Sequence, residues 1–130
     1  MFDTQTLRRF ETLDTPFYFY DLSLLRKTLK EYTFYTKKYN YSAHYALKAN
    51  ADERILSIIK QAGLGADCVS GNEVSLALKI GFPPEKVVYA GVGKSDKEII
   101  TALKGNIFSF NCESIPEIEV INALASSMGK

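Results

Sequence analysis

This chain of 130 residues has few cysteines and histidines and a small net charge. It has two cysteines, one histidine, no tryptophan and a formal net charge of +1. Cys68 and Cys112 lie far apart and form no CxxC pair, which argues against a disulfide or a thiolate metal site and predicts two small buried side chains. A metal site of the usual kind is also disfavoured, because His44 is the only imidazole of the chain.

Long apolar runs and an excess of positive charge are missing as well. No stretch approaches the roughly 18 apolar residues of a membrane span, and the N-terminal run MFDTQTLRRFETLD carries charges where a signal peptide needs an apolar core. A nearly neutral chain offers no electrostatic basis for binding nucleic acid or an anionic membrane. We therefore expect a soluble, cytoplasmic chain with a small-molecule partner and with no nucleic-acid or membrane partner.

What the chain does have is a repeated unit, in which a serine stands three residues before a glutamate. This is the spacing of a capping box, in which the serine and the glutamate each accept a free N–H at the start of a helix. An apolar pattern of helical period and a terminal glycine follow each box, and such a glycine takes the left-handed conformation that ends a helix. The serines are Ser70, Ser95 and Ser114, and the glycines are Gly81, Gly105 and Gly129. A further helix is expected over residues 52–62, ending at Gly63.

A short apolar stretch without alternation precedes each of these four helices: SAHYALKA, ADCVS, VVYAG and IFSFN. Strands that are covered on both faces have this composition, and they are typical of parallel sheets. Four strand-then-helix units with short connections predict a parallel α/β sheet with right-handed crossovers. The stretch FYFYD and the helical pattern from Leu22 to Tyr32 add an N-terminal strand and helix.

Lys48 stands at the carboxyl end of the first predicted strand of the repeat. Alternation places His44, Ala46 and Lys48 on one face, and Tyr45 and Leu47 on the face that meets the helices. Lys48 then faces the interior at the end that carries the active site of α/β barrels. Burial in a solvent-poor pocket without a partner disfavours the charged form of a lysine, and a neutral amine can form a Schiff base with a carbonyl compound. The alternative is a lysine that reaches solvent from a strand end.

Five stretches carry a resemblance to a known family. They are TPFYFYD (15–21), YALKAN (45–50), GLGADCVSGNEV (63–74), YAGVGKSDKEI (89–99) and FNCESIPEIEVIN (110–122). In this order they resemble the N-terminal part of the diaminopimelate decarboxylases, pyridoxal-phosphate enzymes of the alanine-racemase-like group. The resemblance implies the first half of a TIM-like (β/α)8 barrel and the cofactor pyridoxal 5'-phosphate, held by Lys48. It also implies that the full-length protein decarboxylates meso-diaminopimelate to L-lysine as a homodimer.

The resemblance implies roles for other residues too. Asp67 matches an aspartate near the cofactor lysine, where it would help to orient the ring and tune the charge; the alternative is an aspartate that accepts backbone N–H groups at a strand start. Glu73 matches an acidic position, but capping already accounts for it. The loop GVGKS (91–95) is expected to be a turn and cap, because a GxxxxGK[ST] phosphate loop would need glycine in place of Val88. His44 is expected to be a packed side chain rather than a base.

Residues 1–130 are thus expected to form a truncated N-terminal pyridoxal-phosphate-binding barrel domain. It would have about four βα units after the N-terminal strand and helix, without the C-terminal half of the barrel and the β domain. A complete barrel needs about 250 residues. We expect the full-length protein to be an amino-acid decarboxylase and the isolated chain to be inactive. Two alternatives stay open: another decarboxylase or racemase of the group, acting on arginine, ornithine or carboxynorspermidine, and a non-catalytic half barrel.

Overall fold

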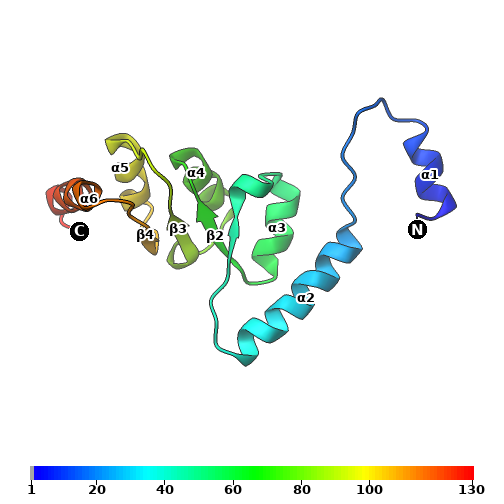
Figure 1. The fold of residues 1–130 in the computed structure, drawn as a ribbon, viewed down its shortest axis with the longest axis horizontal. Coiled ribbons are helices and arrows are strands. Elements are labelled where there is room, and N and C mark those ends of the chain that lie inside the picture. Colours follow the sequence, from blue (N-terminus) through cyan, green and yellow to red (C-terminus); the bar gives the residue numbers. More distant parts are fainter. Residues whose placement is uncertain (1) are drawn as a thin grey trace.

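Four parallel strands in the order β1-β2-β3-β4 form the sheet of this protein. The computed structural model describes residues 2–130. Along the chain the elements are α1 (Thr4–Phe10), α2 (Leu22–Lys38), β1 (His44–Ala46), η1 (Leu47–Ala49), α3 (Glu53–Gln61), β2 (Gly65–Cys68), α4 (Gly71–Ile80), η2 (Pro84–Lys86), β3 (Val87–Tyr89), α5 (Asp96–Lys104), β4 (Ser109–Phe110) and α6 (Ile115–Ser127). Figure 1 shows each strand followed by its helix. The four predicted βα units are therefore confirmed, with strands shorter than expected.

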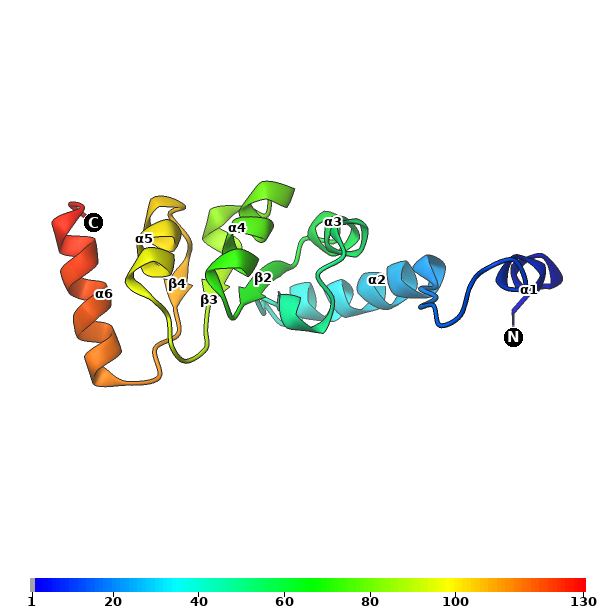
Figure 2. The same cartoon turned by 90° about the horizontal axis from the view of Figure 1, so that it is seen from above.

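The core lies between the sheet and its helices. Ala66 and Cys68 of β2 and Val87 and Tyr89 of β3 are at most 1% exposed, and they pack with buried side chains of α3 and α4. These positions alternate along each strand, so they share one face. Figure 2 shows α3, α4 and α5 on the same side of the sheet. One face of the sheet is therefore covered by helices, as a βα repeat requires.

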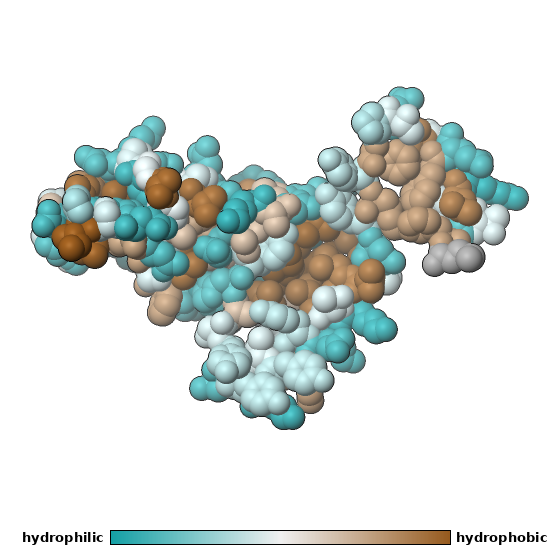
Figure 3. All heavy atoms as spheres, in the orientation of Figure 1, coloured by the Kyte–Doolittle hydropathy of each residue, from teal (hydrophilic) through white to brown (hydrophobic). Residues whose placement is uncertain are grey.

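The chain exposes more surface than a compact protein of its mass. Its accessible area is 9103 Å², against roughly 6,900 Å² expected from the scaling of area with mass. Apolar side chains are visible at the surface around α3 and α1 (Figure 3). Within residues 2–130, no helix is both long enough and apolar enough to span a membrane. The excess area is what an open sheet of half a barrel would have.

The predicted serine caps are present, but only one box closes as expected. Ser70 and Ser114 accept hydrogen bonds from the N–H groups three residues later, at 3.2 and 3.4 Å. Glu98 accepts from the Ser95 N–H at 3.0 Å, which is the predicted reciprocal bond. The two other glutamates reach one residue further back: Glu73 accepts from the Val69 N–H and Glu117 from the Glu113 N–H, both at 2.7 Å. These carboxylates thus tie the strand-to-helix connections to the helices that follow.

The predicted glycine ends are right at three positions and wrong at one. Gly63, Gly81 and Gly129 have positive φ angles of 91, 87 and 70°. Gly105 instead keeps a right-handed conformation with φ of −71°, and Asn106 takes the left-handed one with φ of 51°. Asparagine tolerates this conformation better than other residues with side chains. The reversal of the chain after α5 therefore comes one residue later than predicted.

The strand predicted at FYFYD is not formed, which corrects the expected N-terminal strand of the domain. Residues 17–20 form no strand, whereas the predicted helix after them is present as α2. The segment runs away from the sheet, toward α1 (Figure 1). There Phe10 of α1 packs against Phe17 and Phe19, with ring centroids 5.2 and 5.1 Å apart. A strand needs a neighbour for its N–H and C=O groups, and no strand lies beside this segment within residues 2–130.

Candidate active site

Lys48 lies at the carboxyl end of β1, in the turn η1 rather than in the strand. Its neighbours determine the shape of this turn. Leu47 is 0% exposed and belongs to the core. Asn50 donates its N–H to the Leu47 carbonyl at 3.1 Å, and its side-chain oxygen accepts from the Asp52 N–H at 2.9 Å. Asp52 in turn caps α3. Lys48 is therefore presented by a turn that is anchored on one side in the core and on the other at a helix start.

The side chain of Lys48 is exposed, which corrects the expectation of a solvent-poor pocket. Leu47 joins the core under the helices, as predicted, and Lys48 does not. The strands of an α/β barrel enclose their inner face only when the sheet closes on itself. Four strands leave that face open, so nothing within residues 2–130 encloses the amine. No ion pair of the described residues includes Lys48, and its side chain faces solvent.

Asp67 lies in β2, beside the strand that leads to Lys48. Its Cα pairs with Ala46 of β1 on one side and Val88 of β3 on the other. Because Ala66 and Cys68 point into the core, alternation places Asp67 on the open face. Its Oδ1 atom is buried and has no hydrogen-bond partner among the described residues. Buried polar oxygens are almost always paired, so this one calls for a donor or a cation. The alternative reading, an acceptor of backbone N–H groups, does not account for Oδ1.

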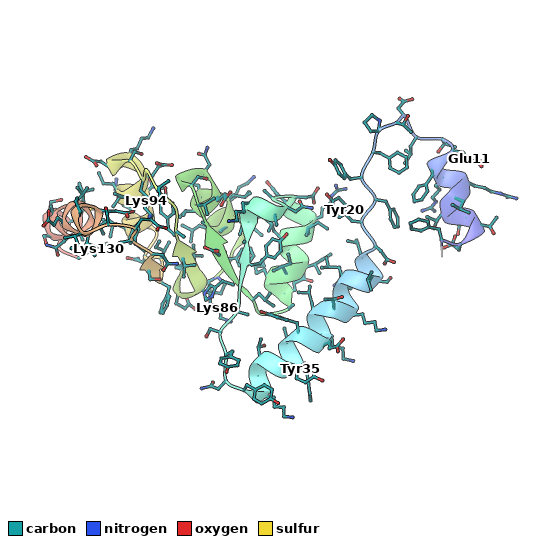
Figure 4. All side chains as sticks on the ribbon, in the orientation of Figure 1. Glu11, Tyr20, Tyr35, Lys86, Lys94 and Lys130 are labelled. Atoms are coloured by element: carbon teal, nitrogen blue, oxygen red, sulfur yellow. The ribbon has the colours of Figure 1, made fainter. Side chains whose placement is uncertain are left out.

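Lys94 is a residue whose role the sequence did not reveal. It belongs to GVGKS, where Gly91 and Gly93 have φ angles of 93 and 75° and form the predicted turn. The Lys94 side chain is only 1% exposed and pairs with Glu117 at 2.5 Å. The two residues are 23 positions apart, and no local pattern connects them. Figure 4 shows Lys94 at the connection that follows β3.

Glu98 is a second such residue. Beyond its bond to Ser95, its Oε1 atom accepts the Gly71 N–H at the start of α4, at 2.9 Å. Hydrogen bonds from the Ser95 hydroxyl, the Ser95 N–H and the Gly71 N–H lower the pKa of Glu98 to about 2. Burial and the Glu98 carboxylate raise the pKa of Tyr89 to about 12. The carboxylate therefore joins the starts of α4 and α5.

The remaining candidates behave as packing residues or differ from expectation. His44 is half-buried and lies against Gly65, where a Cβ would be 2.3 Å from the imidazole Cδ2 atom. Both cysteines are free. Cys68 is buried, as predicted, and burial raises its pKa to about 12. Cys112 is exposed, so the prediction that it is buried was wrong. It lies in the loop between β4 and α6.

The fold and the site define a parallel βα domain that presents a lysine at the carboxyl end of its first strand. Residues 23–128 match the family model described as the pyridoxal binding domain of pyridoxal-dependent decarboxylases. The chain belongs to this family, and the predicted resemblance is confirmed.

Within this family, the chain is similar to several diaminopimelate decarboxylases. The diaminopimelate decarboxylase of Bacteroides thetaiotaomicron is 54% identical over 123 residues, which are 94% of this chain and 32% of the relative. The crystal structure of diaminopimelate decarboxylase from Helicobacter pylori, complexed with L-lysine, superposes with a TM-score of 0.80 at 42% identity, over 95% of this chain and 32% of that one. The enzyme from M. jannaschii, also with L-lysine, has a TM-score of 0.75 at 33% identity, over 81% of this chain and 26% of that one.

The chain therefore spans about a third of the length of its relatives. The parts that align are βα units of TIM-barrel decarboxylases, and the predicted first half of such a barrel is confirmed. This also explains the open face of the sheet, which further strands would cover in a closed barrel.

Proposed function

We propose that this chain is the cofactor-binding N-terminal part of a diaminopimelate decarboxylase. The full-length protein would convert meso-diaminopimelate to L-lysine with pyridoxal 5'-phosphate, as a cytoplasmic homodimer, and the isolated chain would be inactive. The observation that carries the proposal is an exposed Lys48 just after the end of β1, together with an Asp67 oxygen on the neighbouring strand β2 that is buried and has no partner among the described residues. Membership of the pyridoxal-binding family and the 54% identity to a named relative support it.

The residues present fit this cofactor. Pyridoxal phosphate has an aldehyde that an amine can bind covalently and, when bound, supplies a ring that takes up the electron pair left by departing carbon dioxide. Lys48 would hold the cofactor through its ε-amino group, on a turn anchored by Leu47. The orphaned Oδ1 atom of Asp67 would stabilise positive charge beside that amine, since an anionic neighbour favours the charged form.

The lysine assignment is tested by reduction with borohydride. The full-length protein would be treated with pyridoxal phosphate and then borohydride, and the labelled peptide identified by mass spectrometry. The label is expected on Lys48 and should be lost in Lys48→Ala but retained in Lys79→Ala, because Lys79 forms an exposed surface ion pair with Glu53. A label on a different lysine would refute the assignment.

The substrate is tested by release of carbon dioxide. The same protein would be assayed with meso-diaminopimelate, arginine, ornithine and carboxynorspermidine. Diaminopimelate is expected to be the substrate with the highest kcat/KM, with L-lysine as product. Preference for another amine would assign the protein to a different branch of the group. Labelling of Lys48 without turnover of any of the four would favour a non-catalytic cofactor-binding protein.

A further inference from the structure

One buried lysine joins the two connections that follow β3 and β4. The Nζ atom of Lys94 donates to the Gly91 carbonyl at 2.6 Å, to the Asn111 carbonyl at 3.0 Å and to Glu117 Oε1 at 2.5 Å. An ammonium group has three N–H donors, so all of them are used. The same atom lies 5.3 Å from the centre of the Tyr89 ring at the end of β3. Lys94 is thus held by its own loop, by the loop after β4 and by α6.

Glu117 extends this link along the second loop. Its side chain is 15% exposed, and its other oxygen accepts the Glu113 N–H at 2.7 Å. Hydrogen bonds from Lys94 and from the Glu113 N–H lower the pKa of Glu117. The carboxylate therefore stays charged and holds the start of α6 and the β4–α6 loop in one arrangement with Lys94.

The Lys94 loop also touches the loop that follows Asp67. The Ala90 N–H donates to the Cys68 carbonyl at 2.8 Å. Gly91 lies against Val69, since a Cβ added to this glycine would be 3.3 Å from the Val69 carbonyl oxygen. A continuous set of contacts thus runs from Glu117 through the β3–α5 loop to the residues that follow Asp67. Through it, a movement of Lys94 would shift the candidate site.

Stability alone does not explain such a pair. Removing a lysine and a glutamate from water opposes much of their attraction, and well-packed apolar side chains often stabilise a core as well. What a buried pair adds is one defined geometry, and here it defines the geometry of two loops at the carboxyl ends of the strands. In α/β barrels the groups that act on substrates lie on these loops.

We propose that Lys94 and Glu117 are positioning residues of the cofactor site. They hold the β3–α5 and β4–α6 loops in a single arrangement against the end of β2, which carries Asp67. This inference rests on the proposed function and adds residues that act through the loops rather than by touching the substrate.

The first test measures loop order by hydrogen exchange in the 130-residue chain. Lys94→Met removes the three donors with little change of volume, and Glu117→Gln keeps the shape and removes the charge. Losing hydrogen bonds to charged groups should speed amide exchange in residues 90–95 and 111–114 by about 10- to 100-fold. Exchange in α3 should not change. Lys79→Met is the matched control, because it breaks a lysine–glutamate pair whose side chains are 70% and 57% exposed. Unchanged exchange in both loops would overturn the proposal.

The second test uses the full-length protein loaded with pyridoxal phosphate, at a temperature where every variant is folded. Lys94→Met and Glu117→Gln should bind one cofactor per chain and lower kcat by about 10- to 100-fold, as expected when reacting groups are misplaced. The double variant should lose no more than Lys94→Met, and Lys79→Met should keep full activity. Full kcat in Lys94→Met, or loss only in parallel with unfolding, would overturn the proposal. Failure of the proposed function would instead appear in the wild type, which would carry no label on Lys48 and release no carbon dioxide.

Discussion

Replacing Gly71 by alanine should destabilise this protein, and most of this loss should disappear once Glu98 is also replaced by alanine. Gly71 is the first residue of α4, and its N–H donates to Glu98 Oε1 at 2.9 Å. A Cβ at this position would lie 2.5 Å from the Cγ atom of Glu98. Real Cβ atoms do not approach a neighbour so closely, so the Glu98 side chain must move and release the Gly71 N–H.

The expected magnitude is the difference between two effects. A hydrogen bond to a charged group contributes about 1.5–3 kcal/mol. Alanine in place of glycine stabilises a helix by about 0.5–1 kcal/mol. Gly71→Ala alone should therefore lower the free energy of unfolding by about 1–2 kcal/mol. In the Glu98→Ala background the hydrogen bond and the contact with Cγ are absent, but the Cβ of residue 98 still lies 2.9 Å from the added Cβ and offsets the helix effect, so the same substitution should change the free energy of unfolding by less than about 0.5 kcal/mol. The coupling between the two sites is then about 1–2 kcal/mol.

Urea unfolding followed by far-UV circular dichroism measures all four members of this cycle. The helical signal is suitable because α4 and α5 both begin at the coupled residues. Effects that add to within about 0.5 kcal/mol would refute the reasoning, since independent sites behave in this way. So would a Gly71→Ala variant that is more stable than the wild type, because the close contact with Glu98 would then be harmless.

Three further outcomes are expected. Gly65→Ala should destabilise by more than about 3 kcal/mol in urea unfolding, because its Cβ would lie 2.4 Å from the rigid Lys86 carbonyl. The comparison is Gly93→Ala, whose Cβ meets no atom and which carries only the strain of a left-handed backbone, about 1–2 kcal/mol; equal effects would contradict the steric argument. Leu47→Ala removes a side chain that is 0% exposed, so it should lower the free energy of unfolding by about 2–5 kcal/mol, as for other buried leucines. A loss below about 1 kcal/mol would argue against an anchored η1 turn. Glu98, with its pKa lowered from 4.5 to about 2 by the Ser95 hydroxyl and the Ser95 and Gly71 N–H groups, stabilises the fold above pH 4.5, and this contribution should be lost as the pH falls toward 2. Urea midpoints should therefore fall less steeply with acid in Glu98→Gln than in the wild type, and identical pH profiles would exclude the assignment.

Local patterns predicted the repeating part of the fold well. The serine caps and most glycine ends are recognisable in sequence because capping depends on residues within one turn of the helix. Lys48 could be placed at the end of β1 because alternation is also local. The details that failed are those in which two local solutions compete, such as the left-handed residue after α5, which is Asn106 and not Gly105.

Contacts between distant segments could not be predicted in this way. FYFYD has the composition of a strand, yet its aromatic rings pack with α1 and not in a sheet. The exposure of Lys48 depends on whether the sheet closes into a barrel, and the residues near Lys48 in the sequence do not determine this.

The sequence by itself determined the order of the four βα units, the family and the lysine and aspartate of the candidate site, because each of these is encoded in short runs of neighbouring residues. Only the tertiary structure decided that Asp67 has an unpartnered buried oxygen, that Glu98 joins two helices and that Lys94 and Glu117 form a buried pair. These features arise between residues far apart in the chain, and their energies depend on burial and on distances that exist only after folding.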